Sequence, residues 1–210
     1  MAYKRSDGGW IEGRAVRALV SPVRQEIVDT IEALGGDAVV ADIAAHLGRP
    51  ADGIYYHLRR LVDGGVLREG DDPGDGRGRR YRTVAPRGKR VRLKYGRGSQ
   101  ANKATVSKVV AGMLRTAERD FSGALNGGDA VGEGPLRNLW ASRLKGWVGE
   151  TDLREINRLL ARLSELLLQP REAGRDRLVT LAWMLAPIDD KPVRRDAARA
   201  GARRSRSGTG

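Results

Sequence analysis

Arginine and aromatic side chains gather between residues 49 and 82, and their types and spacing suit contact with a polyanion. Guanidinium groups donate paired hydrogen bonds to phosphates and base edges, and the small residue Gly53 allows a close approach. Within this stretch Ile54, Leu58 and Leu61 recur at helical spacing, which marks an inward face. On a helical wheel the outward side carries Asp52, Tyr56, Arg59 and Asp63, with Arg60 on its shoulder.

Three helices are predicted around these residues from their start and stop signals. The first opens at Ser21–Pro22 and its apolar stripe ends at Gly35–Gly36, after a short helix over 14–20. The second is broken by Gly48, and the third opens at Pro50 and stops at a second glycine pair, 64–65. A tight glycine-containing turn between the second and third helices predicts a helix-turn-helix.

Two short strands, 66–69 and 80–84, are predicted after the third helix, joined by the turn-rich loop 70–78. This loop is the expected wing, so residues 14–86 are interpreted as a winged helix-turn-helix domain. Residues 1–13 are expected to be a flexible arm in which Trp10 and Ile11 are possible anchors. The predicted fold class is α+β.

This architecture nominates residues for contact with double-stranded DNA. The first turns of a recognition helix read base edges, its arginines reach phosphates or guanines, and wing arginines reach the minor groove. His57 suits either a phosphate contact or packing at the domain edge. Any one arginine could equally be solvated surface, but together they favour DNA binding. The candidates are Arg49, Asp52, Gly53, Tyr55, Tyr56, His57, Arg59, Arg60, Arg77, Arg79 and Arg80, with Arg82 as a possible backbone contact.

The positive charge is concentrated at the two ends of the sequence. The 210 residues carry a formal net charge of +13. Residues 1–95 have 18 basic and 13 acidic side chains, residues 96–190 have 14 and 12, and residues 191–210 have 7 and 1. This distribution favours ends that meet a polyanion and a middle that meets protein.

Residues 87–190 are predicted to form a C-terminal α/β dimerisation or effector domain. Its expected order is strand, helix, strand, helix, strand, over 91–95, 106–121, 136–148, 151–167 and 178–186. A buried helical turn is the alternative for 178–186. The leucine stripe of 151–167 suits packing on its own sheet or a dimer seam, and the 106–121 helix competes for the seam. Residues 191–210 are expected to be a basic, disordered tail.

Several function classes are disfavoured by composition. The absence of cysteine excludes disulfides, thiolate catalysis and cysteine-based metal sites. The two histidines, His46 and His57, both fall in the helix-turn-helix, so no catalytic triad is expected. The spaced glycines of 74–78 lack the strand-then-helix context of a phosphate cradle, and the aspartates of 71–75 lack calcium-loop spacing. We therefore expect a non-enzyme without cofactor or metal. No apolar run is long enough to span a bilayer or to serve as a signal peptide.

Three segments resemble the winged-helix transcriptional regulators of the arsenical-repressor-like (ArsR-like) group. They are 21–28, 40–48 and 56–67, and the resemblance covers about residues 15 to 85. It implies a bacterial or archaeal, cytoplasmic and nucleoid-associated regulator that binds operator DNA as a homodimer, usually as a repressor released by an effector. Metal-sensing members carry cysteines in the second helix; here Val39–Ile43 holds none, so thiolate sensing is excluded.

The expected function is therefore sequence-specific DNA binding by a homodimeric transcriptional regulator. A small-molecule effector or a protein partner would act at the C-terminal domain, because the helix-turn-helix has no sensing cysteine. Two alternatives stay open from the residues alone. One is a winged-helix module that binds protein, and the other is a non-specific, nucleoid-associated DNA binder.

Overall fold

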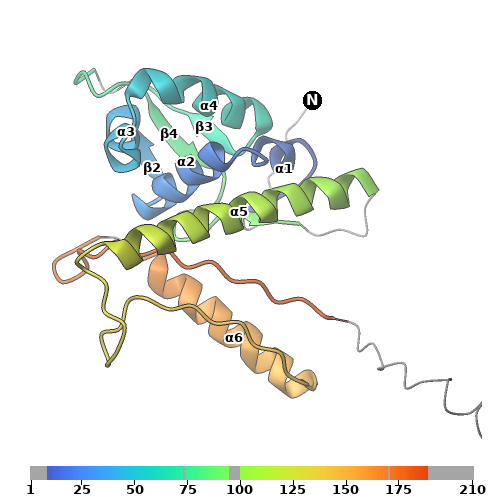
Figure 1. Ribbon diagram of the computed structural model, residues 1–210. Helices are drawn as coiled ribbons and strands as arrows, with labels where there is room; N and C mark the ends of the chain where they lie inside the picture. Colours follow the sequence, from blue (N-terminus) through green and yellow to red (C-terminus); the bar gives the residue numbers. More distant parts are fainter. Residues whose placement is uncertain (1–8, 73, 95–99, 170, 189–210) are drawn as a thin grey trace, which may run out of the picture.

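A computed structural model describes residues 9–72, 74–94, 100–169 and 171–188 of the chain. The helices are α1 (Arg14–Ala18), α2 (Pro22–Ala33), α3 (Val40–Leu47), α4 (Ala51–Gly64), α5 (Gln100–Asn126) and α6 (Glu150–Leu167) (Figure 1). The strands are β1 (Trp10–Ile11), β2 (Asp37–Val39), β3 (Leu67–Glu69), β4 (Arg80–Thr83) and β5 (Arg92–Leu93). The α+β class predicted from the sequence is confirmed. The arm residues 1–8 and the predicted tail 191–210 lie outside the described residues.

One apolar core holds α1 to α4 together. Ile27 and Ile31 on α2 and Ile54, Leu58 and Leu61 on α4 are fully buried, at 0 % exposure. Each such side chain stabilises the fold by roughly 1.5–3 kcal/mol relative to an exposed position. The predicted inward face of α4 is therefore confirmed, and burial fixes the rotation of the helix about its axis.

A three-stranded antiparallel sheet of order β2-β4-β3 forms the wing side of the domain. Tyr81 on the central strand lies opposite Ala38 and is only 4 % exposed. The hairpin β3–β4 was predicted, but β2 was not, because Asp37–Val39 is short and runs directly into α3. The Val40 and Ala41 N–H groups donate to the carbonyls of Arg79 and Arg77, which fastens the wing to the start of α3.

The predicted arm is wrong for its last residues. Trp10–Ile11 form β1, which pairs in parallel with β5, and Ile11 is 4 % exposed. The Arg92 guanidinium lies 5.7 Å from the centre of the Trp10 ring. Both suggested anchors therefore hold the N-terminal segment on the domain, through a strand pairing that local sequence cannot reveal.

The long helix α5 packs against α1 and α2 rather than within a separate sheet. Buried Gln25 on α2 donates from its side-chain amide to the Leu19 carbonyl at 2.7 Å and to the Val109 carbonyl of α5 at 3.1 Å. Gly112 makes room for this side chain, since a Cβ there would lie 2.8 Å from the Gln25 Nε2 atom. The first helix assigned to the C-terminal domain thus covers the helix-turn-helix core.

Two of the three strands predicted for the C-terminal domain are wrong. Segments 136–148 and 178–186 are neither strand nor helix, although the helix between them is confirmed as α6. A β-compatible apolar run shows that a segment can enter a sheet, but a sheet also needs a partner strand. Within the described residues no strand pairs with either segment. None of the described helices is long and apolar enough to cross a membrane.

Gly64 is required by the contact between α4 and α1. A Cβ at this buried glycine would lie 2.6 Å from the Ala18 Cβ. We expect Gly64→Ala to lower the free energy of unfolding by about 1–2 kcal/mol, because overpacking outweighs the better helix propensity of alanine. Gly53→Ala is the matched control, since its nearest neighbour would be the Pro50 Cγ at 3.8 Å. Urea denaturation should show the control unchanged or slightly stabilised; equal stabilisation of both variants would contradict the close contact.

Glu32 makes stability depend on pH. Burial raises the pKa of its carboxyl to about 7, against the opposing effect of the Val91 N–H that donates to it. Because this folded-state pKa lies above the ordinary value of 4.5, ionisation disfavours the fold and stability falls as pH rises between these values.

We therefore expect Glu32→Gln to remove part of the fall in Tm between about pH 5 and about pH 8. The variant should gain on the order of 1 kcal/mol over the wild type at the upper end, allowing for solvent screening. Thermal denaturation followed by circular dichroism across this range measures it. Parallel curves for the two proteins would rule out the role of Glu32.

Candidate nucleic-acid interface

The turn before α4 presents the helix to solvent. Gly48 ends α3 in the left-handed conformation with φ of 60°, and Pro50 caps the start of α4. With Ile54, Leu58 and Leu61 buried, the opposite face is open. Exposed on it are Asp52, Gly53, Tyr56, Arg59 and Arg60, and Arg49 is exposed in the turn.

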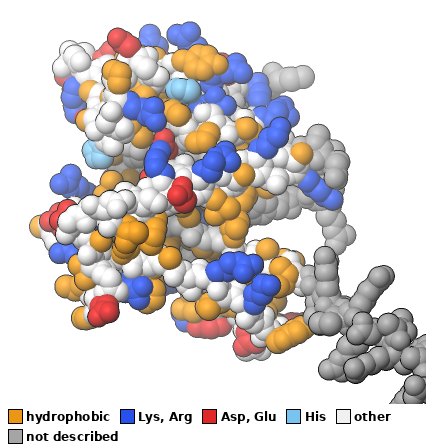
Figure 2. Space-filling model, viewed as in Figure 1, with side chains coloured by type: hydrophobic (Ala, Val, Ile, Leu, Met, Phe, Trp, Pro, Cys, Tyr) orange, Lys and Arg blue, Asp and Glu red, His pale blue; other side chains and the backbone are white. Residues whose placement is uncertain are grey.

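Arg59 and Arg60 lie on this face, and neither guanidinium group forms a hydrogen bond or an ion pair with the described residues. Tyr56 beside them is 64 % exposed, and its ring meets that of His57 edge-on at 5.4 Å. Figure 2 shows basic side chains spread over the α4 side of the domain. An anion can therefore bind these two guanidinium groups of α4 without displacing a carboxylate of the described residues.

The wing arginines are different, because each lies against a carboxylate. Arg77 pairs with Asp75 at 2.7 Å and with Asp42 at 3.8 Å, and Arg79 pairs with Glu69 at 2.6 Å. Asp37 on β2 holds two arginines of β4, Arg80 at 3.3 Å and Arg82 at 2.7 Å. Solvent screens exposed pairs of this kind, so a phosphate can replace the carboxylate at low cost.

Tyr55 lies apart from the other candidates of α4. It is partly buried and packs against the core, and a Cβ at Gly78 in the wing would lie 3.0 Å from its hydroxyl. Gly78 has φ of 76°, a conformation that glycine adopts without strain. The structure thus places Tyr55 beneath the wing, where it supports the loop, while Tyr56 faces outward.

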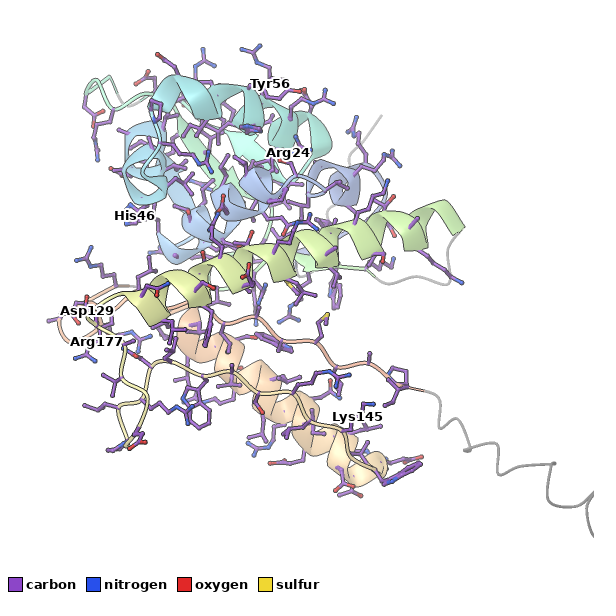
Figure 3. All side chains as sticks on the ribbon, viewed as in Figure 1. Arg24, His46, Tyr56, Asp129, Lys145 and Arg177 are labelled. Carbon is purple, nitrogen blue, oxygen red and sulfur yellow. The ribbon has the colours of Figure 1, made fainter. Side chains whose placement is uncertain are left out.

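Two residues of α2 that the sequence analysis did not nominate border the interface. Arg24 donates to the Ala18 carbonyl and lies on the α4 side of α2, with Tyr56 beyond it (Figure 3). Glu26 pairs with Arg49 at 3.7 Å and also with Arg119 of α5. The two Glu26 pairs join residues far apart in the chain, so helical periodicity could not have identified them.

Residues 19–70 match the family model described as a helix-turn-helix domain. The match covers α2, β2, α3, α4 and β3, about a quarter of the chain, and includes the residues whose geometry is given above. This part of the protein is a helix-turn-helix domain of the winged type, the class of domain found in DNA-binding regulators. No curated protein matches the sequence.

His57 is placed where a charged phosphate contact is unfavourable. Its Nδ1 is buried without a hydrogen-bond partner, and burial together with the charges of Arg24 and Arg49 lowers the pKa of the imidazole. The ring is therefore neutral near pH 7.

We expect His57→Gln to leave the pH dependence of DNA affinity unchanged between about pH 6.5 and about pH 8. Fluorescence anisotropy at constant ionic strength measures this dependence. A gain in affinity towards acid pH that is present in the wild type and absent from the variant would show instead that His57 binds DNA in its charged form.

Proposed function

We propose that this protein is a sequence-specific transcriptional regulator that binds operator DNA as a homodimer, with α4 in the major groove and the wing against the neighbouring backbone. The observation that carries the proposal is a pair of exposed arginines, Arg59 and Arg60, that have no partner among the described residues. They lie on the outward face of a helix whose inward face is fully buried. A rigid helix that presents free guanidinium groups suits direct readout, because bidentate contacts to guanine require a fixed direction of approach.

The remaining exposed residues of α4 complement these arginines. Gly53 near the start of the helix has open space around it, and the nearest atom to an added Cβ would be 3.8 Å away. The backbone can therefore approach the groove floor closely at this point. Tyr56 offers an apolar ring edge and a hydroxyl on the same face, which suits contact with a thymine methyl group or a phosphate.

The wing plays a secondary role in this proposal. Arg77 and Arg79 must exchange Asp75 and Glu69 for phosphates when DNA binds. After the exchange the carboxylates lie near the DNA phosphates and repel them. The net gain in binding free energy is therefore smaller than for an arginine that pairs with no carboxylate. We infer that α4 supplies sequence preference and most of the affinity, and that the wing fixes the orientation of the domain.

We further propose a cytoplasmic repressor of the ArsR-like group, without enzymatic activity, that is released from DNA by an effector or partner acting outside the helix-turn-helix. Support comes from the run of residues from Tyr56 to Leu67 and from the lack of a sensing cysteine. Dimerisation is favoured because a single winged helix makes few base contacts, and a two-fold symmetric dimer doubles them on a palindromic site.

The proposal is tested by two matched double variants. We expect Arg59→Ala with Arg60→Ala to weaken binding to a selected operator by about 100-fold, at roughly 1–3 kcal/mol for each contact, and to remove the preference over scrambled DNA. Arg77→Ala with Arg79→Ala removes the same charge and should weaken both DNAs alike, by about tenfold or less. Fluorescence anisotropy gives the affinities, and thermal denaturation confirms that both variants fold.

Three outcomes would contradict the proposal. Full operator affinity in the Arg59 and Arg60 variant would remove α4 as the reading element. Equal binding of operator and scrambled DNA by the wild type would indicate a non-specific binder. A folded wild type that binds no DNA would indicate a module that recognises protein.

A further inference from the structure

Exposed large apolar side chains are concentrated in residues 131–188. Elsewhere in the described chain four such side chains are exposed, namely Trp10, Tyr56, Leu114 and Leu125. In 131–188 Leu144 and Trp147 are 90 % and 87 % exposed. The α6 leucines that face outward lie between 38 % and 48 % exposure, and the segment after α6 adds Leu178, Met184 and Ile188. The large apolar side chains of this region are therefore not buried by other residues in the way that those of the N-terminal core are.

The exposed apolar side chains of this region add up to a large area. Seventeen large apolar side chains of 131–188 are at least 38 % exposed. Their exposed areas sum to roughly 1,500–2,000 Å². Each partner of a stable interface contributes about 800 Å². The area is thus sufficient for an extensive interface.

Outside α6, much of the backbone of this region has no backbone hydrogen-bond partner among the described residues. Residues 137–148 and 176–188 are neither helix nor strand, and Figure 1 shows them with α6 on the side of α5 away from the helix-turn-helix core. Figure 3 labels Asp129 and Arg177, which precede or begin the two segments, at the same end of this region. The segments therefore run in the same direction, and α6 returns between them, as in a β-α-β unit.

No backbone N–H of 140–148 or 176–188 donates to a backbone carbonyl within the described residues. Extended chain with free N–H and C=O groups is a template for strand pairing. Leu144 and Trp147 are three residues apart, so they lie on opposite faces of an extended segment. A flat surface such as a membrane would cover one of these faces. A partner that adds strands covers the free backbone edge, which a flat surface does not.

We propose that segments 140–148 and 176–188 pair with the same segments of a second copy of this chain, so that the two copies complete one sheet covered by their α6 helices. Charge favours a second copy as the partner, because residues 96–190 have 14 basic and 12 acidic side chains, whereas residues 1–95 have an excess of cations and repel one another. The inference rests on the proposed function, since it names the seam of the proposed homodimer.

The test is the oligomeric state of the full chain without DNA. Sedimentation equilibrium should show a dimer for the wild type, and Leu144→Glu with Trp147→Glu should raise the dimer dissociation constant by at least about tenfold. Leu125→Glu is the matched control, because Leu125 is 60 % exposed on α5, outside the proposed seam. It should stay dimeric. A monomeric wild type, a dimer unaffected by the double variant, or dissociation by Leu125→Glu alone would overturn the proposal.

Hydrogen exchange on the wild type gives a second measurement that does not depend on the folding of a variant. Amides of 140–148 and 177–186 should be protected at concentrations where the protein is dimeric and lose protection on dilution. Unprotected amides in a dimer would overturn the strand pairing. Failure of the proposed function would give a different result. An intact dimer that selects no DNA sequence would contradict the proposed regulator but would still support the proposed dimer seam.

Discussion

The whole interface depends on the burial of one side of α4. Ile54, Leu58 and Leu61 are inaccessible to solvent, and a rotation of α4 by one residue would expose them. The cost of that exposure is several kcal/mol, since each side chain contributes roughly 1.5–3 kcal/mol. The direction of Tyr56, Arg59 and Arg60 is therefore fixed by the core before any ligand is bound. The proposal that α4 contributes more to DNA affinity than the wing rests on this constraint. It also rests on the carboxylates that already pair with the wing arginines.

Helix α2 connects α4 with α5. Two adjacent residues do so by different chemistry: Gln25 donates to carbonyls of both Leu19 and Val109, and Glu26 pairs with both Arg119 on α5 and Arg49 in the turn before α4. A displacement of α5 would have to move or break these contacts. The helix that leads into the C-terminal region is thus connected through Glu26 of α2 to Arg49 in the turn before α4.

The parts predictable from the sequence are those specified by local pattern. The apolar steps of α2 and α4, the glycines that end α3 and α4, and the β3–β4 hairpin were all found where the pattern indicates them. The strands that were not predicted, β1 and β2, depend on pairing with residues far away in the sequence. β1 forms only by pairing with β5, which lies beyond the whole helix-turn-helix domain in the sequence. In the same way, β2 forms only by pairing with β4.

The predicted strands 136–148 and 178–186 show the same limit from the other side. Their residue pattern suits a sheet, and the described residues of a single copy contain no strand that pairs with them. At the interface, the sequence indicated which face of α4 is outward because that is a matter of helical spacing. It could not distinguish Arg59 and Arg60 from Arg77 and Arg79, because the difference lies in carboxylates brought together by the fold.

The central claim is that α4 reads DNA in a symmetric dimer, and selection from random-sequence DNA by the purified full chain tests it most directly. The account predicts an enriched palindromic motif whose half-sites lie about one helical turn apart, because two identical helices related by a two-fold axis enter successive major grooves. Enrichment of no motif, or of a motif without two-fold symmetry, would contradict it.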